Sequence, residues 1–255
     1  MKHYFGVILL ALFLALTGFT NRDTPKITVA VAANMQYAIR ALDTVFEKTA
    51  HVKVVVVLGS SGNLTQQIMQ GAPFDLFISA DTNYPRQLYQ QNFGVERPKV
   101  YAQGVLVLWT TRPDIQPGAD GKFLISDKIK AIALANPATA PYGFAAVAFL
   151  KKHHLYDQLK HKMVYGENIG QASQFIATGA ADVGFTAKAI VVSEQMQRKG
   201  SWVALNTLDY PPIKQAALLL KYGQENNPLA ARKFYEFLFS NQAKAIFKKF
   251  GYILN

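Results

Sequence analysis

The amino-acid sequence predicts an α/β protein of two lobes, with mostly parallel sheets flanked by helices. Short apolar runs alternate with segments whose apolar residues recur at helical spacing, from residue 27 to the end of the chain. The predicted strands are too many for one small sheet, which favours two sheets. Residues 111–121 hold two prolines and two glycines, and this loop is typical of a change of domain near mid-chain.

Composition narrows the class of protein. The chain has 255 residues, of which 50% are hydrophobic and 17% charged, so it can hold one or two domains with a full core. Cysteine is absent, which excludes disulfides, a thiolate metal site and a lipid-modified cysteine. The net charge of +11 suits an anionic partner. Because the basic residues are scattered, we do not expect that partner to be a nucleic acid.

The first 20 residues have the layout of a secretory signal peptide. Lys2 and His3 precede an apolar run at 4–16, and small or polar residues follow at 17–20. The run is short for a membrane span. We therefore predict an exported, periplasmic protein, with an uncleaved anchor as the alternative.

The first half of the predicted fold alternates strands and helices. Asn34 is expected to cap the first helix, and Gly71 to end the second. The expected elements, in order, are a strand at 27–33, a helix reaching Phe46, a strand at 52–58, a helix from 63, a strand at 74–79, a helix from Asp81 to Gln91 and a long strand at 100–110.

The second half repeats this alternation. The loop at 136–143 should open the helix that follows it, and Gly166 to Ile169 should open another. The expected elements are a short helix at 123–128, strands at 131–135, 163–165, 182–186, 202–205 and 216–220, and helices at 144–153, 169–178, 228–240 and 242–250.

The stretch from Leu58 to Leu64 carries the clearest functional pattern. An apolar strand feeds a helix through two glycines and two serines, which leaves free N–H groups and hydroxyls at the helix N-terminus. Such donors, together with the positive end of the helix dipole, suit an anion. The alternative is an ordinary turn in which a serine only caps the helix.

Three further strand-to-helix junctions have the same character, and this favours the anion hypothesis. The four junctions are Ala33-Asn34, Ser60-Ser61-Gly62, 140–143 and 168–170, and none contains lysine or arginine. In open α/β sheets, ligands bind at the carboxyl ends of strands, where helix N-termini point. Walls that only donate hydrogen bonds match a fully ionised tetrahedral dianion, whereas a protonated oxyanion would require a carboxylate to accept its proton.

The other candidate residues have structural interpretations. Asp75 is expected to tie a loop and Asp81 to cap a helix, with ligand contact as the alternative. Glu167 and Asp182 are interpreted as a first-turn carboxylate and a strand-entry residue. Three histidines lie in a lysine-rich stretch and lack a third metal ligand at helical spacing, so we interpret them as surface residues: His153, His154 and His161.

The junction motifs, taken in chain order, resemble those of the periplasmic molybdate-binding proteins of bacterial ABC importers. The most specific stretch is Gly71 to Asp81, and the resemblance covers nearly the whole chain after the signal peptide. The matching segments are 31–34, 59–64, 71–81, 136–143, 166–169 and 181–185. The resemblance implies a two-lobed periplasmic binding fold (type II-like) whose lobes close on molybdate or tungstate in the cleft between them.

The resemblance also implies where the lobes and the ligand lie. The first lobe is expected at 26–105 plus 215–255 and the second at 106–214, with the two connecting strands as a hinge. The implied ligand residues are Ala33, Asn34, Ser61, Tyr142 and Ile169.

One position departs from the family pattern. A tyrosine that some members use as a ligand corresponds to Ala187 in this chain. We therefore expect another donor to complete the ligand shell, either Tyr142 or Asn34.

As a function, the sequence predicts a monomeric binding protein, not an enzyme, that delivers molybdate or tungstate to a membrane permease. No cofactor and no metal coordinated by side chains is expected. Two alternatives stay open: a binding protein for another oxyanion such as sulfate or phosphate, and an exported hydrolase of oxyanion esters. The hydrolase would need a nucleophile with a partner base, and Ser60 and Ser61 have no such partner in the sequence pattern.

Overall fold

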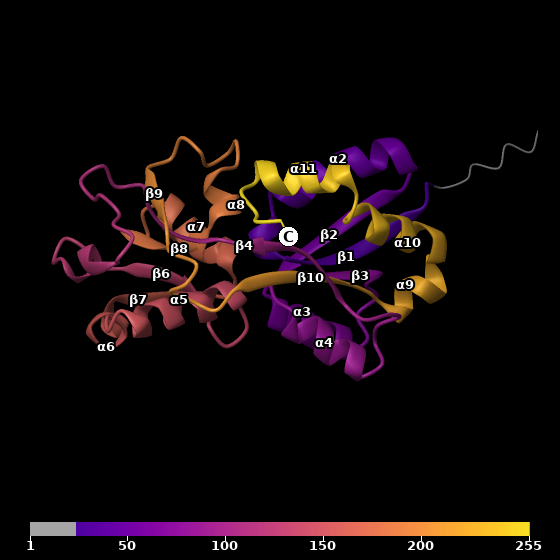
Figure 1. Ribbon diagram of the computed structural model, residues 1–255, viewed down its shortest axis with the longest axis horizontal. Coiled ribbons are helices and arrows are strands. Elements are labelled where there is room, and N and C mark those ends of the chain that lie inside the picture. Colours follow the sequence, from indigo (N-terminus) through magenta and orange to yellow (C-terminus); the bar gives the residue numbers. More distant parts are fainter. Residues whose placement is uncertain (1–23, 255) are drawn as a thin grey trace, which may run out of the picture.

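The computed structural model describes residues 24–254, and it contains two five-stranded sheets with helices around them (Figure 1). The predicted signal peptide lies outside the described residues. The first sheet has the order β2-β1-β3-β10-β4 and the second β7-β6-β8-β5-β9. We call the parts built on these sheets lobe I and lobe II. The predicted two-lobed α/β fold is confirmed.

The strand bounds follow the apolar runs of the sequence. Lobe I contains β1 (Lys26–Ala32), β2 (Lys53–Gly59), β3 (Leu76–Ser79), β4 (Lys99–Gly104) and β10 (Ile213–Leu219). Lobe II contains β5 (Leu106–Thr110), β6 (Ile132–Ala135), β7 (Met163–Gly166), β8 (Val183–Ala187) and β9 (Ser201–Ala204).

Each sheet is mixed, with four strands in one direction and a single strand against them. In lobe I, β1 pairs in parallel with β2 and β3, whereas β10 pairs antiparallel with β3 and β4. Lobe II repeats the pattern, because β6 is parallel to β7 and β8 while β5 is antiparallel to β8 and β9. The antiparallel strands β10 and β5 are those that enter each sheet from the other lobe, which explains their opposite direction.

The chain changes lobe at Val105, inside the run predicted as one strand at 100–110. Gly104 ends β4 in the first sheet, and Leu106 begins β5 in the second. The loop at 111–121 therefore does not mark the change of domain, since it leads from β5 to β6 within lobe II. The strand β10 makes the return crossing. The exact limits of the predicted lobes stay a prediction.

Helices cover both faces of the first sheet (Figure 1). Val29 and Val31 pack in a cluster with α2, α10 and α11, whereas Ala30, between them, packs with α3 and α4 on the opposite face. This alternation is what a strand buried on both faces requires. Helix bounds in this lobe are α2 (Ala38–Ala50), α3 (Ser61–Met69), α4 (Asn83–Gln90), α9 (Lys221–Asn226), α10 (Pro228–Phe237) and α11 (Asn241–Lys249), with the 3₁₀ helix η1 (Ala33–Met35).

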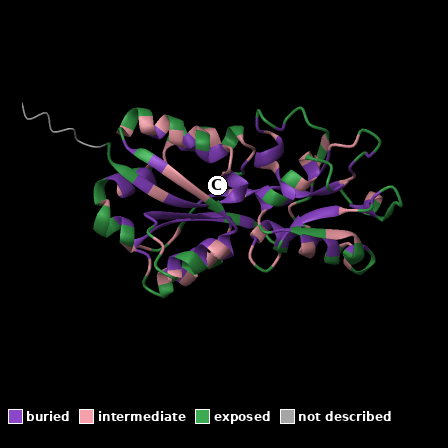
Figure 2. Cartoon of the chain, turned by 180° about the vertical axis from the view of Figure 1, so that it is seen from behind, coloured by how far each residue is buried: buried purple, intermediate pink, exposed green. Residues whose placement is uncertain are grey.

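Lobe II has its own core around the fully buried Trp109 of β5, packed with residues of β6, β8, α5 and α7. Figure 2 shows the same plan in both lobes, with buried strands inside and helices that expose their outer faces. The helices here are α5 (Pro141–Lys152), α6 (Tyr156–Leu159), α7 (Ile169–Ala177) and α8 (Lys188–Val191), with the 3₁₀ helices η2 (Lys122–Ile125) and η3 (Lys160–Lys162). No helix within residues 24–254 combines the length and apolar character needed to cross a membrane.

Two predicted helix starts are wrong in detail. Asn34 does not cap a helix; it lies inside η1, and α2 begins only at Ala38. The Asn34 side chain instead forms buried hydrogen bonds with Gln215 and Tyr252. Helix α5 begins at Pro141, three residues earlier than predicted, because proline is well tolerated in the first turn, where its missing N–H costs nothing. The three short helices α6, α8 and α9 were not predicted.

Helix α2 carries a carboxyl group that opposes folding at neutral pH. Asp43 Oδ1 is buried and has no hydrogen-bond partner among the described residues. Burial raises the pKa of Asp43 from 3.8 to about 6, and the Glu47 carboxylate one turn further on adds to the rise. Because the folded pKa is raised, the stability that protonated Asp43 contributes is fully present below the unfolded pKa and is lost as pH rises through about 6.

We therefore expect Asp43→Asn to stabilise the protein at pH 7.5 but hardly at pH 4. The measurement is the midpoint of urea unfolding at both pH values. Asp157→Asn, whose side chain is 87% exposed, serves as the control and should change neither midpoint. An equal shift of the Asp43→Asn midpoint at both pH values would show that the charge of Asp43 is not responsible.

Candidate functional site

The four junctions predicted to bind an anion meet at one small pocket between the lobes. Lobe I contributes the segments that follow β1 and β2, and lobe II those that follow β6 and β7. All five predicted ligand residues line this pocket. The complete lining is Ala32, Ala33, Asn34, Gly59, Ser60, Ser61, Ala80, Ala140, Pro141, Tyr142 and Ile169. We call it the anion pocket.

The anion pocket is small and carries no charge. Its volume of about 10 Å³ is roughly the space that the centre of one water molecule needs. None of its lining residues, all within the described chain, is a lysine, arginine, histidine, aspartate or glutamate. An anion bound here would have to be stabilised by neutral donors and by helix dipoles.

Helix first turns supply those donors. Ser61, Tyr142 and Ile169 stand in the first turns of α3, α5 and α7, where amide N–H groups have no partner within the helix. Side chains of Ser60 and Asn168 cap α3 and α7 by accepting from Asn63 N (3.3 Å) and Gln171 N (3.1 Å). The serine cap is thus confirmed for Ser60, whereas Ser61 makes no cap and, like Ser60, lines the pocket; its contact with an anion stays a prediction.

The Ser61 hydroxyl is oriented by the backbone of the neighbouring strand. Ser61 is fully buried, and its Oγ accepts a hydrogen bond from Ala80 N at 3.0 Å. Ala80, directly after β3, also lines the pocket and was not predicted. Because one lone pair of Oγ is used in this way, the hydroxyl hydrogen is free to point to a ligand oxygen.

A buried polar network lies beside the pocket, and the sequence analysis missed most of it. Asn34 Nδ2 donates to Gln215 Oε1 at 2.9 Å and to the Tyr252 hydroxyl at 3.0 Å. The Tyr101 hydroxyl donates to the same Gln215 oxygen at 2.8 Å. Gln215 Nε2 donates in turn to the Tyr142 hydroxyl at 3.2 Å. The sequence feature that could have indicated this network is Gln215, a polar residue directly before the apolar run 216–220.

Burial keeps the hydroxyls of this network protonated. It raises the pKa of Tyr101 and of Tyr142 well above 10, and the nearby Tyr252 hydroxyl adds to both shifts. Burial also raises the pKa of Tyr252. The three tyrosines are therefore neutral at any physiological pH.

The structure also places the two residues that bear on the missing family tyrosine. Ala187 is buried at the end of β8 and does not line the anion pocket. The Tyr142 hydroxyl faces the network and lies where a methyl group on Gly104 would collide with it. The backbone of Tyr142 lies in the first turn of α5, so its amide N–H, and not its hydroxyl, is the donor at the helix N-terminus.

Besides the Gln215–Tyr142 bond, further hydrogen bonds join the lobes across the cleft. Gly62 N donates to Thr139 O at 2.9 Å, and the Tyr84 hydroxyl donates to Ala138 O at 3.1 Å. Asn63 Nδ2 donates to Glu167 Oε1 at 2.9 Å. Glu167 therefore bridges the lobes, which corrects its interpretation as a first-turn carboxylate. These contacts and the small pocket volume describe a closed cleft.

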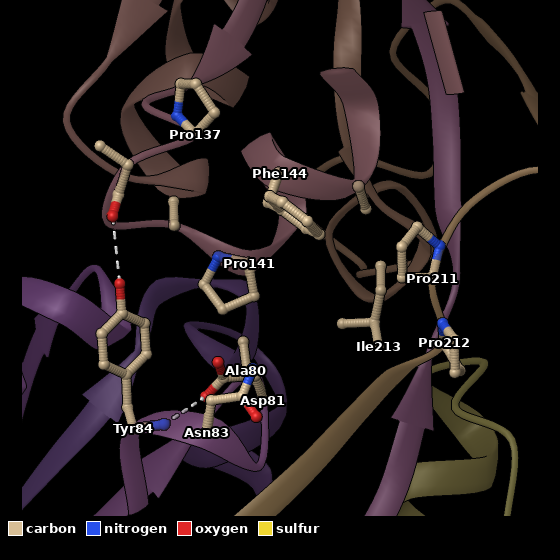
Figure 3. A pocket seen from close by; sticks show the side chains of 13 residues that line it. Ala80, Asp81, Asn83, Tyr84, Pro137, Pro141, Phe144, Pro211, Pro212 and Ile213 are labelled. Carbon is tan, nitrogen blue, oxygen red and sulfur yellow. Dashed lines mark hydrogen bonds between the residues drawn. The ribbon is translucent and has the colours of Figure 1, made fainter. Parts of the chain in front are cut away.

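A larger pocket of about 350 Å³ adjoins the anion pocket (Figure 3). It shares Ala80, Ala140 and Pro141 with the anion pocket, and its remaining walls are largely apolar, including Phe144 and the prolines 211 and 212. Figure 3 shows Tyr84 at one side of this space, bonded to the Ala138 carbonyl. First turns of α4 and α5 border the larger pocket, whereas those of α3, α5 and α7, with η1, meet at the anion pocket, which also holds all five predicted ligand residues; the smaller pocket is therefore the candidate site.

The predicted structural carboxylates contact backbone and side chains and do not line the anion pocket, although Asp81 borders the larger one. Asp75 accepts from Thr28 N (2.6 Å) and Asn227 Nδ2 (2.8 Å), which ties the start of β3 to β1 and to α10. Asp81 Oδ1 accepts from the Ser79 hydroxyl and from Tyr84 N in the first turn of α4. Burial raises the pKa of Asp81, although the Ser79 hydrogen bond opposes the rise.

Asp182 is tied by several donors at the entry to β8. Its oxygens accept from Lys130 N (2.7 Å), Ala131 N (3.0 Å) and Arg112 (2.7 Å). Burial raises the pKa of Asp182, but these hydrogen bonds outweigh it and hold the pKa below its usual value. His153 pairs with Asp209 at 3.0 Å, and the described residues contain no group of three or more metal-ligating side chains.

Comparisons with known proteins agree on one class. The family model described as bacterial extracellular solute-binding protein matches residues 27–253. The chain is 39% identical over 230 residues to the molybdate-binding protein ModA of Rhodobacter capsulatus, covering 89% of this chain and 88% of that protein. It is 38% identical over 229 residues to ModA of Azotobacter vinelandii, covering 89% of each.

Solved structures give the same picture. The structure of the periplasmic molybdate-binding protein of Azotobacter vinelandii superposes with a TM-score of 0.85 at 34% identity, covering 90% of this chain and 99% of that one. The structure named substrate binding domain of putative molybdenum ABC transporter, from Clostridium difficile, superposes with a TM-score of 0.64 at 30% identity, with the same coverage.

Because Ser61 Oγ accepts from a buried amide, we expect Ser61→Ala to destabilise the protein even without ligand. The substitution leaves Ala80 N without its acceptor, which costs about 1–3 kcal/mol. The measurement is urea unfolding in a buffer free of oxyanions, with Gln67→Ala on the exposed face of the same helix as the control. An unchanged free energy of unfolding would show that this bond does not orient the hydroxyl.

Proposed function

The chain belongs to the family of bacterial extracellular solute-binding proteins, and from this premise we propose that its solute is molybdate. It captures the anion in the periplasm and delivers it to the membrane permease of an ABC importer. The ligand residues are Ala33, Asn34, Ser61, Tyr142 and Ile169, acting mainly through amide N–H groups and the Ser61 hydroxyl. The lobes at 26–105 plus 215–255 and at 106–214 close on the anion as a monomer.

The single observation that carries the proposal is the uncharged pocket at which first turns of helices from both lobes meet. Molybdate is a tetrahedral dianion that carries no proton at neutral pH, so each of its oxygens only accepts hydrogen bonds. Amides and hydroxyls at helix N-termini satisfy such an ion without a buried lysine or arginine, whose desolvation would be costly. The relatives named for molybdate binding support the same ligand.

The pocket should select against other oxyanions by two properties of the ion, its protonation state and its size. Phosphate at neutral pH carries at least one proton, and no carboxylate among the described lining residues is present to accept it. An unpaired buried donor costs about 1–3 kcal/mol. Sulfate carries no proton, so only its smaller size excludes it, because some donors would lie out of reach. Tungstate has the charge and nearly the size of molybdate, and we propose that it binds too.

A binding role fits this pocket better than ester hydrolysis. Ser61 is the hydroxyl that an attack would use, and the described lining offers no histidine, lysine or carboxylate to act as its base. We therefore propose that the protein is not an enzyme. A turnover assay with a generic phosphate ester tests this part of the proposal, and measurable hydrolysis that Ser61→Ala abolishes would overturn it.

The proposal is tested by calorimetric titration with molybdate, tungstate, sulfate and phosphate. We expect phosphate to bind roughly five- to hundredfold more weakly than molybdate. Molybdate affinity should be nearly constant from pH 6 to 8, because Tyr142 is the one titratable lining residue described and burial raises its pKa well above 10. Phosphate binding as tight as molybdate binding would contradict a site that only donates.

The Asn63–Glu167 hydrogen bond should hold the closed lobes together. Because the bond is exposed, we expect Asn63→Ala to weaken molybdate binding by only about two- to tenfold, mainly through faster dissociation. Stopped-flow kinetics measures the rate, and X-ray scattering should show that molybdate still compacts the variant. Gln67→Ala, on the exposed face of the same helix, is the control. A slower association with unchanged dissociation would contradict this role.

A further inference from the structure

Gln215 is a buried polar residue at the boundary between the two lobes. It lies on β10 where the chain returns from lobe II to lobe I, and its side chain is completely buried. The pairing of β10 with β4 shifts register between Gln215 and Ala216, because β4 has one extra residue there, Tyr101, which forms a local bulge opposite Gln215. Bulges re-aim the side chains beside them. A glutamine is thereby placed between a residue of each lobe: Asn34 of lobe I and Tyr142 of lobe II.

The amide of Asn34 is left half satisfied in this arrangement. Its Nδ2 makes two hydrogen bonds, to Gln215 and Tyr252, while its Oδ1 is buried without a partner among the described residues. Asn34 lines the anion pocket, and its Nδ2 is turned toward the network. The Oδ1 corner is therefore the side-chain atom left for the pocket. A bare carbonyl oxygen is costly when buried and repels an anion.

Turning both amides by 180° removes this conflict without moving any other heavy atom. The Asn34 oxygen then takes the inner position, where it accepts from Gln215 Nε2 at 2.9 Å and from the Tyr252 hydroxyl at 3.0 Å. The Gln215 oxygen takes the other position, where it accepts from the Tyr142 hydroxyl at 3.2 Å. The free corner of Asn34 is now an NH₂ group, a donor.

The remaining partner of Gln215 also fits the turned arrangement. The second Nε2 hydrogen of Gln215 points to the Tyr101 hydroxyl at 2.8 Å, which accepts it. Tyr101 then donates its own hydrogen to Met35 Sδ, which lies 2.9 Å away. Every other polar atom of the network then has a partner, and the single unpaired group is the Asn34 NH₂ at the anion pocket.

We propose that Gln215 is a positioning residue for anion selectivity: with both amides turned, it holds Asn34 so that Nδ2 donates to the bound oxyanion. Gln215 itself does not touch the ligand. This inference rests on the proposed function, because it assumes that the pocket binds an oxyanion. It assigns to Asn34 the donor that replaces the tyrosine missing at Ala187.

A double-mutant cycle tests whether Gln215 acts through Asn34. We expect Gln215→Leu to weaken molybdate binding at least tenfold, measured by calorimetry. In an Asn34→Ala background the same substitution should cost less than threefold, because the side chain that it positions is gone. Equal losses in both backgrounds, or no loss in the single variant, would overturn the proposal.

Gln215→Glu gives a second readout that a merely structural role would not move. A carboxylate cannot donate, so Asn34 Nδ2 should turn inward and its oxygen face the anion. We expect molybdate affinity to fall at least hundredfold at pH 8 and to recover as pH falls and the new carboxyl group is protonated. The titratable groups that face this position are Tyr101, Tyr142 and Tyr252, and burial raises the pKa of all three.

The matched control is Gln103→Glu, which adds the same charge to neighbouring β4 outside the network. Its molybdate affinity should change little between pH 6 and 8. An equal pH dependence in both variants, or a Gln215→Glu affinity that does not depend on pH, would overturn the proposal.

The wild-type protein provides a test that does not depend on the folding of variants. In ¹⁵N-labelled protein, the side-chain NH₂ signals of Asn34 and Gln215 should both shift when molybdate is added, and those of Gln103 should not. Unshifted Asn34 and Gln215 signals would overturn the inference. If the wild type binds sulfate or phosphate but not molybdate, the proposed ligand is wrong, and the same tests with that anion still decide the role of Gln215.

Discussion

The whole arrangement depends on the two crossings of the chain between the sheets. At Val105 the chain leaves β4 and starts β5 in the other sheet, and β10 brings it back. Each crossing strand enters its new sheet antiparallel, between the three parallel strands and the last strand of that sheet. The two sheets consequently have the same plan, and the carboxyl ends of their parallel strands, with the helices that follow, meet at one pocket.

Much of this could be predicted from the sequence because apolar runs and turn residues are local signals. The strands at 26–32, 53–59 and 132–135 were recognisable, as was the convergence of the four junctions. The strand pattern did not reveal the crossing at Val105, because the run at 100–110 was interpreted as one strand; the lobe limits at 105 and 106 came only from the family resemblance. The prediction that Asn34 caps a helix was wrong for a similar reason. An asparagine directly after a strand can be a helix cap or a member of a buried network, and only its partners, which are distant in the sequence, distinguish the two roles.

The partners of Asn34 lie far from it along the chain, at Gln215 and Tyr252. Tyr252 lies near the C-terminus, and Ile253 beside it exchanges backbone hydrogen bonds with Gln103 of β4. The C-terminal segment thus lies against β4 and places the Tyr252 hydroxyl beside Asn34. No spacing within the sequence could reveal a contact between residues 34 and 252, whereas the fold makes it inevitable.

Neutral donors place a demand on the protein that charged residues would not. A lysine attracts an anion in any orientation, but an amide side chain attracts with one end and repels with the other. A pocket lined by first turns of helices solves this for backbone groups, because the helix fixes the direction of every N–H. Side-chain amides have no such guarantee, and their direction must be set by partners whose own donors and acceptors are fixed. Gln215, which lies opposite the bulge of β4, supplies that control because it bonds to a residue of each lobe. The basic charge of the chain lies outside the pocket, so it can draw anions to the surface while the pocket sorts them by protonation and shape.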